Sequence, residues 1–317
     1  MRIGVLSNPR AGRRPGRVAR LRALCGRQPE VVYVETGPQL GVGDAVAALA
    51  ARDIGVLAVY GGDGTLQRVL TAMLRSPASA RLPLIAPLKG GRTNAGALDI
   101  GSHPNPLRAL SGLMKTVRHD SLAQAVVERP VLRVELGPDE AVQYGFFFGL
   151  GVIYRTTELK HRLLPKHYFQ GPLTSGAIIG LVALRALLGS CRGVLRRDRL
   201  DIRLDGCPLA SGSFLLAFAT TLDSVLGLRP FWGREEAPIR CTAVAEGASR
   251  RLLAPLRIVR GRPPQPDGPL AGYVSRNVHQ LQFRLDCGLV IDGELFGPQA
   301  GRVVRLEADR RLRFVRT

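Results

Sequence analysis

A cluster of glycine, aspartate and threonine near residue 60 has the residue types of a phosphate-binding turn. It lies inside VYGGDGTLQRVL, residues 59–70, between an apolar strand-like run and a helix-like pattern. Its members are Gly61, Gly62, Asp63, Gly64 and Thr65. Glycines can adopt positive φ and let backbone N–H groups approach a ligand closely. A helix that begins near Leu66 would present its first N–H groups and its positive dipole end to an anion, so a phosphate is the expected ligand.

The two polar side chains of this turn suit a nucleotide better than a bare phosphate. Asp63 would repel a free phosphate, and we expect it beside a metal-bound phosphate or as the acceptor of a hydroxyl proton. Thr65 is expected to cap the following helix and to donate to a phosphate oxygen. The alternative is a tight turn with an aspartate cap and no ligand. The segment is not a Walker motif, because no Gly-Lys-Ser/Thr sequence occurs.

Two further strand ends carry similar residues. SNPRAG, residues 7–12, leaves the first strand through a turn with Arg10, and Arg13 and Arg14 follow. APLKGGRTNAGALDIG, residues 86–101, leaves a later strand through two glycines into a helix-like pattern. Because the carboxyl ends of parallel strands meet at one edge of a sheet, these turns should converge with the first. That convergence favours a nucleotide site over the tight-turn alternative.

The elements that must position these turns follow an alternating pattern in the first third of the chain. Apolar runs typical of buried parallel strands alternate with helix-like spacings, and Asp44 is expected to cap one of the helices. The expected strands are RIGVLS, VVYV, IGVLAVY and LPLIAP, and two of the expected helices are DAVAALAA and residues 107–117. This alternation of strands and helices predicts an open, mostly parallel α/β sheet.

From about Pro130 the pattern changes to short β-like runs joined by Gly, Pro and Asp. These runs predict an antiparallel, sandwich-like second domain. They are VLRVEL, YGFFFG, LDIRL, SFLLAFAT, IRCTAV, HQLQFRL and LVIDGELF. One helical segment, residues 174–188, interrupts them. With the basic residues before it, this segment either faces a membrane and accepts an acyl chain or is a core helix behind a solvated basic stretch.

The charge balance favours anionic partners. The formal net charge is +20, with 45 basic residues, mostly arginine, against 25 acidic residues. Phosphates, anionic lipid or nucleic acid would suit it, although an arginine-rich codon bias gives the same excess. Aromatic residues make up only 5%, which disfavours a single-stranded nucleic-acid platform. The five scattered cysteines predict neither a metal cluster nor a disulfide framework, and no apolar run predicts a signal peptide or a membrane span.

Taken in order, the three turns resemble a known family. Asn-Pro-x-Ala-Gly, Gly-Gly-Asp-Gly-Thr and Pro-Leu-x-Gly-Gly-x-x-Asn are similar to motifs of the diacylglycerol kinase catalytic-domain family of lipid kinases, which also includes sphingosine and ceramide kinases and bacterial relatives. The resemblance extends to FFFGLG at 146–151, to DGE at 292–294 and to a short closing strand, so it covers most of the chain. NAD kinases share the Gly-Gly-Asp-Gly-Thr turn.

The resemblance implies ATP as phosphoryl donor, Mg²⁺ as cofactor and a hydroxyl of a diacylglycerol-like or sphingoid-like lipid as acceptor. It implies a cleft between an α/β domain, residues 1–128 with a returning strand at about 303–317, and a β-rich lipid domain, residues 129–302. It places these residues at the nucleotide: Asn8, Pro9, Arg10, Ala11, Gly12, Thr36, Gly61, Gly62, Asp63, Gly64, Thr65, Thr93 and Asn94.

The segment VIDGELF supplies the second pair of carboxylates. Asp-Gly between apolar runs is by itself a hairpin signal, and RLDGCPL at Asp205 has the same shape without a following acid. The family match places Asp292 and Glu294 at the cleft. Phosphoryl transfer needs an acceptor oxygen in line and its proton accepted, so either residue could act as the base, together with Asp63 at the nucleotide.

Several positions depart from the family pattern. Gln67 and Arg68 stand where Asn-Glu is usual, and Arg92 stands where Thr is common. An acidic loop that supports a structural metal in several bacterial relatives is not evident, and its candidates here are Asp223, Glu235 and Glu236. The rival interpretations are therefore an NAD-kinase-like enzyme and a degenerate member that binds nucleotide or anionic membrane without turnover.

These observations predict a cytoplasmic, peripherally membrane-associated lipid kinase. Its expected partners are the lipid substrate and an anionic membrane surface, with no specific nucleic acid. The oligomeric state stays open, with a homodimer as one outcome.

Overall fold

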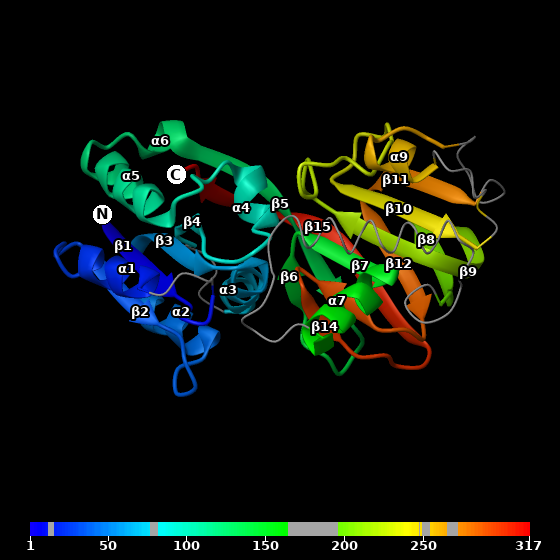
Figure 1. Cartoon of the computed structure of the whole chain (residues 1–317), viewed down its shortest axis with the longest axis horizontal. Coiled ribbons are helices and arrows are strands. Elements are labelled where there is room, and N and C mark those ends of the chain that lie inside the picture. Colours follow the sequence, from blue (N-terminus) through cyan, green and yellow to red (C-terminus); the bar gives the residue numbers. More distant parts are fainter. Residues whose placement is uncertain (12–15, 77–81, 164–195, 247, 249–253, 265–271) are drawn as a thin grey trace. The chain divides into compact units, whose positions relative to one another are not determined.

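The chain forms two compact units in the computed structural model (Figure 1). The structure describes residues 1–11, 16–76, 82–163, 196–246, 248, 254–264 and 272–317. Unit 1 contains Met1–Arg129 and Arg311–Thr317, and unit 2 contains Pro130–Arg310. Each unit has its own apolar core, and each is described by itself.

Unit 1 is built on a parallel sheet with strand order β2-β1-β3-β4-β15. The strands are β1 Arg2–Ser7, β2 Val31–Glu35, β3 Ile54–Gly61, β4 Leu84–Lys89 and the end of β15, Arg302–Val315. The chain returns to this sheet near its end, where Phe314 pairs with Ile85. β3 is buried along nearly its whole length, as expected for a central parallel strand covered on both faces.

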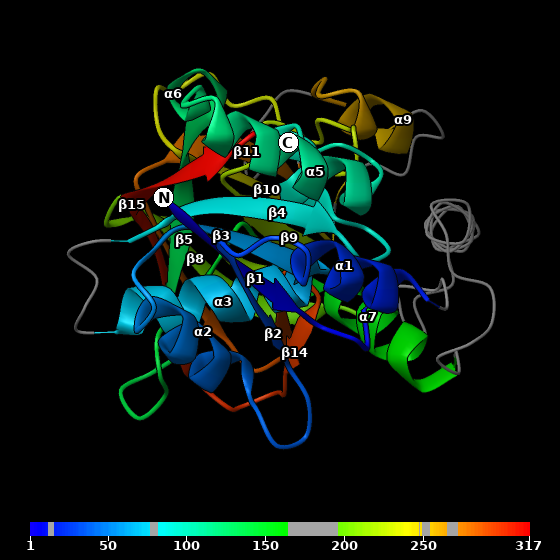
Figure 2. The same cartoon turned by 90° about the vertical axis from the view of Figure 1, so that its left-hand side faces the viewer.

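Helices cover both faces of this sheet, with α5 and α6 on one side and α2 and α3 on the other (Figure 2). The helices of unit 1 are α1 Arg17–Cys25, α2 Val42–Ala50, α3 Asp63–Arg75, α4 Ala95–Ile100, α5 Pro106–Arg118 and α6 Leu122–Ala125. On the α5 side, Leu110 and Leu113 pack with Val56 and Ala58 of β3. The predicted α/β architecture of the first third is confirmed.

Two expected helix starts are wrong. The N-cap of α2 is Gly41, and Asp44 lies in the first turn of that helix instead of capping it. Helix α3 begins at Asp63, earlier than the expected start near Leu66, with Gly62 as its N-cap. In both cases the helix begins directly after a glycine. The prediction missed this because it relied on the apolar residues of the helix, and the first turn is polar.

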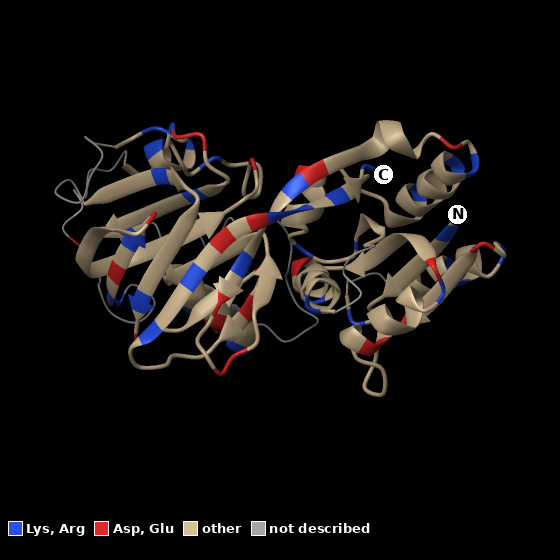
Figure 3. Ribbon diagram, turned by 180° about the vertical axis from the view of Figure 1, so that it is seen from behind, with Lys and Arg blue, Asp and Glu red and all other residues tan. Residues whose placement is uncertain are grey.

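Unit 2 is β-rich and largely antiparallel. Its strands are β5 Val126–Glu135, β6 Gln143–Gly145, β7 Phe147–Gly151, β8 Asp198–Leu204, β9 Cys207–Thr220, β10 Ile239–Ala245, β11 Tyr273–Val278, β12 Gln280–Leu285, β13 Leu289–Ile291, β14 Glu294–Phe296 and most of β15. Inward residues such as Leu200, Ile202 and Phe283 form one apolar core. Outward positions alternate with them, and Arg203 and Arg284 are exposed there. Charged residues of both signs lie along the strands of this unit (Figure 3). The predicted β-rich second part is confirmed.

Some elements of unit 2 were not foreseen, and one prediction cannot be placed. Strand β11 and the helices α7, Val152–Leu163, and α9, Ala254–Val259, have no counterpart in the sequence prediction. The helix expected at 174–188 lies outside the described residues. Over the part of the chain that the structure describes, no helix has the length and apolarity to cross a bilayer.

Candidate functional site

The three predicted turns meet at the carboxyl edge of the unit 1 sheet. Asn8 follows β1, Gly62 and Asp63 follow β3, and Gly90 and Gly91 follow β4. Parallel pairing of β1 with β3 and of β3 with β4 places these strand ends side by side. The convergence expected from the sequence is therefore present.

The side chain of Asn8 connects the first turn to the second. Its Nδ2 donates to Thr65 Oγ1 at 2.9 Å, and its backbone N–H donates to Tyr60 O at 2.9 Å. Its Oδ1 accepts from the Arg10 N–H at 3.0 Å, which folds the turn back on itself. Thr65 is buried and makes no side-chain capping bond to α3. The expectation that Thr65 caps the helix is wrong, because the N-cap is Gly62 and Thr65 lies inside α3, where its hydroxyl accepts from Asn8.

The second and third turns cross at their glycines. The N–H groups of Gly90 and Gly91 both donate to Gly61 O, at 2.9 and 3.0 Å. A Cβ on Gly91 would lie 2.3 Å from the Cα of Gly62, so position 91 could not carry a side chain without moving the backbone. The expectation of positive φ at Gly61, Gly62 and Gly64 is wrong, since none of the three has it. Close approach of one backbone to another is the reason for glycine at the crossing.

Asn94 closes the third turn. Its Oδ1 accepts from Gly91 N–H at 2.8 Å, and its Nδ2 donates to Gly91 O at 2.9 Å. Its φ is 52°, a left-handed conformation that asparagine tolerates better than most residues. Thr93 is half-buried beside it, and Arg92 is exposed. The amide of Asn94 therefore fixes the shape of the turn that crosses Gly62.

Asp63 joins α3 to α4. Its Oδ1 accepts from the Gly96 N–H at 3.3 Å, in the first turn of α4. Burial raises the pKa of the Asp63 carboxyl to about 6, against the opposing effect of the N–H groups of Gly96, Ala95 and Asn94. The carboxylate thus lies at the edge where the sequence predicts phosphate, and it also holds the start of a neighbouring helix.

Positive groups and the start of α3 lie at the same edge. The first i→i−4 bond of α3 runs from Leu66 N–H to Gly62 O at 3.0 Å, so the N–H groups before it precede the helical ladder. Arg10 is exposed next to Asn8. Lys89, the last residue of β4, is half-buried, and burial lowers its pKa. Lys89 was not among the predicted site residues, although its place in the Pro-Leu-x-Gly-Gly motif could have indicated it.

The remaining predicted nucleotide residues lie on the first two strand ends. Pro9 is exposed, and Ala11 donates its N–H to Asn8 O at 2.9 Å. Thr36 is buried after β2 and donates its N–H to Ser7 O at 2.9 Å. Gly12 lies outside the described residues.

In unit 2, Asp292 is held by the backbone of a neighbouring strand. Its Oδ2 accepts from Phe146 N–H at 2.9 Å and its Oδ1 from Phe147 N–H at 3.0 Å. Its own N–H donates to Phe147 O at 3.0 Å. Asp292 and Gly293 have φ of 47° and 88°, which identifies the hairpin turn between β13 and β14.

The hairpin at Asp205 makes the same kind of contact. Asp205 and Gly206 have φ of 47° and 80°, and the turn joins β8 to β9. Asp205 Oδ1 accepts from His279 N–H at 3.0 Å and from Gln280 N–H at 2.7 Å. The contacts of Asp292 are therefore those of a turn that docks on a neighbouring strand. Glu294, the half-buried first residue of β14, is the carboxylate that distinguishes the later hairpin.

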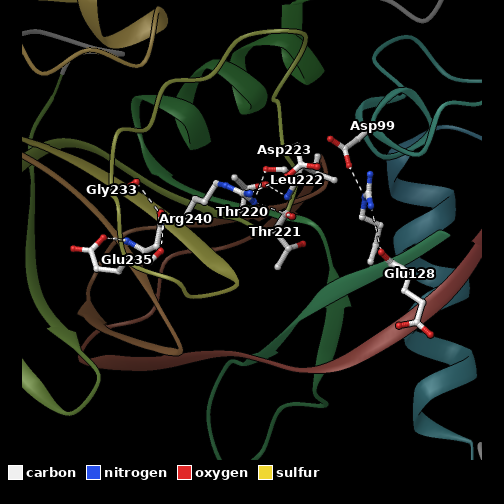
Figure 4. A network of polar contacts seen from close by, with 11 residues as sticks. Asp99, Glu128, Thr220, Thr221, Leu222, Asp223, Gly233, Glu235 and Arg240 are labelled. Atoms are coloured by element: carbon white, nitrogen blue, oxygen red, sulfur yellow. Dashed lines mark hydrogen bonds and ion pairs between the residues drawn. The ribbon is translucent and has the colours of Figure 1, made fainter.

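An arginine of β10 binds the loop where a structural metal was considered (Figure 4). Arg240 donates to Thr221 O at 3.3 Å and to Leu222 O at 3.1 Å, and it pairs with Asp223 at 2.8 Å. Glu235 accepts from Asn277 N–H at 2.9 Å and lies 3.5 Å from Arg276. Glu236 is exposed. Within the described residues, no three His, Cys, Asp or Glu side chains are grouped to hold a metal ion.

Comparisons with known proteins agree with this architecture. Residues 2–125 match the sequence model of the diacylglycerol kinase catalytic domain. A diacylglycerol kinase from Bacillus anthracis has a TM-score of 0.64 at 17% identity, over 100% of this chain and 97% of that one. An NAD kinase from Archaeoglobus fulgidus in complex with ATP has a TM-score of 0.53 at 14% identity, over 100% and 94% of the two chains.

Yeast NADH kinase complexed with NADH is also similar, with a TM-score of 0.54 at 12% identity over 100% of this chain and 84% of that one. No curated protein matches the sequence. At these identities the solved structures establish the fold, which this chain shares with both kinds of kinase. The family match covers residues 2–125, the segment that carries all three turns.

Proposed function

We propose that this protein is an ATP-dependent lipid kinase that phosphorylates a hydroxyl of a diacylglycerol-like or sphingoid-like lipid. The observation that carries the proposal is the interlocking of three turns at one sheet edge, within the segment that matches the diacylglycerol kinase catalytic domain. Asn8 binds Thr65, and Gly62 crosses Gly91, so the three turns form one rigid surface. A surface of this kind suits a triphosphate held mainly by backbone groups.

The residues at this edge fit Mg·ATP. The crossing glycines bring the backbones of two strand ends together, and α3 begins there with its first N–H groups outside the helical ladder. Mg²⁺ is often bound by one or two carboxylates together with substrate phosphates, and Asp63 supplies one carboxylate. The ion would neutralise charge on the phosphates, and Arg10 and Lys89 would add positive charge.

On the acceptor side, Glu294 is the better of the two candidates for the base. Both carboxylate oxygens of Asp292 already accept backbone N–H groups, which hold the side chain in the hairpin turn. In the proposed step the lipid oxygen bonds to the γ-phosphorus as the bond to the β-phosphate oxygen breaks. Glu294 takes the hydroxyl proton, and ADP leaves with the electron pair of the broken bond.

The fold is shared with NAD and NADH kinases, and this favours an NAD-kinase-like activity as the second candidate. The two are separated by an acceptor panel with ATP labelled at the γ-phosphate. Diacylglycerols, sphingoid bases, total lipid extract and NAD are offered in parallel with Mg²⁺. Label in extractable lipid supports the proposal, label in NADP supports the rival, and absence of label with every acceptor indicates a degenerate member.

The departures at positions 67 and 68 do not decide between an active and a degenerate member. Gln67 is only 2% exposed and donates through Nε2 to Thr71 Oγ1 at 3.1 Å, so its side chain lies within the packing of α3. Arg68 is exposed on the same helix. We expect position 67 to act on the stability of α3.

We also propose a peripheral association with anionic membranes at the cytoplasmic side. A lipid acceptor resides in a bilayer, and the net charge of +20 would attract a negative lipid surface. Specific nucleic-acid binding is not expected.

A further inference from the structure

A short turn in unit 2 presents a leucine in a strained conformation. Val225 and Leu228 form an antiparallel bridge, with N–H to O distances of 2.8 and 3.0 Å in the two directions. Leu226 and Gly227 connect them with φ of 56° and 77°. Glycine and asparagine are the residues that suit such a turn, whereas a leucine at positive φ is an outlier.

The strained leucine is also exposed. Leu226 is 41% exposed and Leu228 40% exposed, so the turn places two large apolar side chains in water. Stability alone would favour asparagine at Leu226 and a polar residue at Leu228. Backbone strain combined with exposed apolar surface points to a role outside the folding of the unit.

Helix α9, which carries a third exposed leucine, lies beside the chain that leaves this turn. It ends at Val259, and in the turn that follows Arg262 N–H donates to Arg257 O and Gly261 N–H to Ile258 O, both at 2.9 Å. A Cβ on Gly261 would lie 2.6 Å from Arg229 O, so the end of α9 packs directly on the chain leaving the turn. Leu256 of α9 is 50% exposed.

Exposed arginines lie in the same two segments as these leucines. Arg229, Arg257 and Arg260 are exposed, and none of them forms an ion pair with another described residue. Arg240 and Arg276, by contrast, are paired with Asp223 and Glu235. We call the six residues the Leu226 surface: Leu226, Leu228, Arg229, Leu256, Arg257 and Arg260.

We propose that the Leu226 surface docks on an anionic lipid bilayer, with its leucines in the interface and its arginines at the lipid phosphates. Apolar side chains surrounded by cations suit the boundary between acyl chains and negative headgroups. A protein partner or a second copy of this chain would also cover leucines, but negative lipid headgroups in addition satisfy three exposed arginines that have no ion-pair partner among the described residues. The inference rests on the proposed function only for its reason to approach a membrane.

Vesicle binding tests the inference without ATP or any acceptor, so it can fail or succeed independently of kinase activity. The full chain is mixed with vesicles of phosphatidylcholine alone or of phosphatidylcholine with phosphatidylglycerol, and bound protein is measured by sedimentation. Trp232, the only tryptophan, packs on the apolar cluster that contains Ala254 of α9, and it reports by fluorescence. We expect binding to the anionic vesicles, a blue-shifted Trp232 emission, and weakening as salt rises.

Matched variants locate the binding surface. Leu226→Asn should weaken binding roughly tenfold while leaving the melting temperature equal or higher, because asparagine suits positive φ. Leu159→Asn is the control, since Leu159 on α7 is 39% exposed and lies outside the surface. Arg257→Gln should weaken binding about fivefold at low salt, as expected for one arginine near a negative surface. Arg305→Gln, on exposed β15, is its control.

Three results would overturn the inference. Equal binding of the wild-type protein to neutral and anionic vesicles would show that the arginines do not contact lipid phosphates. Equal losses for Leu226→Asn and Leu159→Asn remove the role of the turn. A dimer in sedimentation velocity that Leu226→Asn dissociates, without vesicle binding, assigns the surface to a second copy of the chain.

Discussion

At the scale of single residues, Asp63 has the most informative environment. Burial raises the pKa of its carboxyl from 3.8 to about 6, although it accepts an N–H from α4. Because the folded-state pKa is raised, the folded protein binds this proton more tightly than the unfolded chain. The free energy of unfolding should therefore fall as pH rises from about 4 to about 6, and the loss should remain at higher pH.

Asp63→Asn should accordingly stabilise the protein above pH 6 while it removes turnover. Asn Oδ1 can still accept from Gly96, and the cost of a buried charge, about 2–3 kcal/mol for a shift of this size, is removed. Thermal melting of wild type and variant from pH 4 to pH 8 measures this, with the difference growing across the interval. A variant that is less stable at pH 8, or that keeps the wild-type transfer rate, would show that Asp63 is only a cap.

Variants of the two Asp-Gly hairpins in unit 2 distinguish a structural role from a catalytic one. Asp292 uses both carboxylate oxygens as acceptors, so Asp292→Asn places an NH₂ group against a backbone N–H and should cost about 1–3 kcal/mol of stability. Asp205 uses only Oδ1, which asparagine retains, so Asp205→Asn should cost less than about 1 kcal/mol.

Glu294→Gln should act on rate instead. Loss of a general base costs about a hundredfold or more in turnover, while melting and ATP affinity should stay near wild type. Initial rates of phospholipid formation are measured beside melting temperatures for all three variants. Full activity of Glu294→Gln would show that the DGE segment has only the structural role of a hairpin turn.

The sequence indicated which residues gather at the site but not what each one does there. Residue types and order were enough to find Asn8, Asp63 and Asn94, because strand ends must meet at one edge of a parallel sheet. The contact between Asn8 and Thr65, which are 57 positions apart, depends on the register of β1 against β3. No local pattern encodes that register, so Thr65 was wrongly expected to be a cap.

At the scale of elements, the crossing of two glycine turns sets how closely the strand ends approach. Gly91→Ala would force a methyl to within 2.3 Å of the Gly62 Cα, so we expect a loss of at least about 2 kcal/mol and of ATP binding. Gly43→Ala is the control, because Gly43 lies in α2 with no atom within 4 Å of an added Cβ. It should gain about 0.5–1 kcal/mol. Denaturant melts and nucleotide titrations that show Gly91→Ala equal to wild type would contradict the crossing.

Arg240 holds the loop that follows β9. Its guanidinium binds Thr221 O, Leu222 O and Asp223, a set of oxygens that a divalent cation would otherwise suit. Arg240→Lys should lower the free energy of unfolding by about 1–3 kcal/mol, because an ammonium cannot reproduce the planar fork. EDTA should leave the melting temperature of the wild type unchanged. Strong destabilisation of the wild type by EDTA would mean that a metal ion supports the fold.

Elements with continuous apolar runs were predictable, and elements defined by context were not. β3 is apolar from end to end and was foreseen, whereas β11 contains Ser275, Arg276 and Asn277 and reads as loop. Ser275 is buried in the structure, where Trp232 N–H donates to its hydroxyl at 2.9 Å. Such a strand owes its position to its neighbours, and pairing with β10 is not visible in sequence.

At the scale of the whole molecule, the chain contains an α/β unit that carries the three turns and a β-rich unit that carries Glu294. The division falls between Arg129 and Pro130, next to the change of pattern seen in the sequence. The fold is shared with both diacylglycerol and NAD kinases, so fold alone leaves the acceptor open. The acceptor must therefore be identified by measuring phosphoryl transfer.

The central claim is most directly tested by transfer of labelled γ-phosphate from ATP into extractable lipid, for wild type beside Asp63→Asn at pH 8. The account predicts Mg²⁺-dependent label in lipid for the wild type and about a hundredfold less, or lower still, for the variant. It also predicts that the variant retains measurable ATP binding, since the glycine crossing is intact. Label that appears in NADP but not in lipid, or no label with any acceptor, would contradict the account.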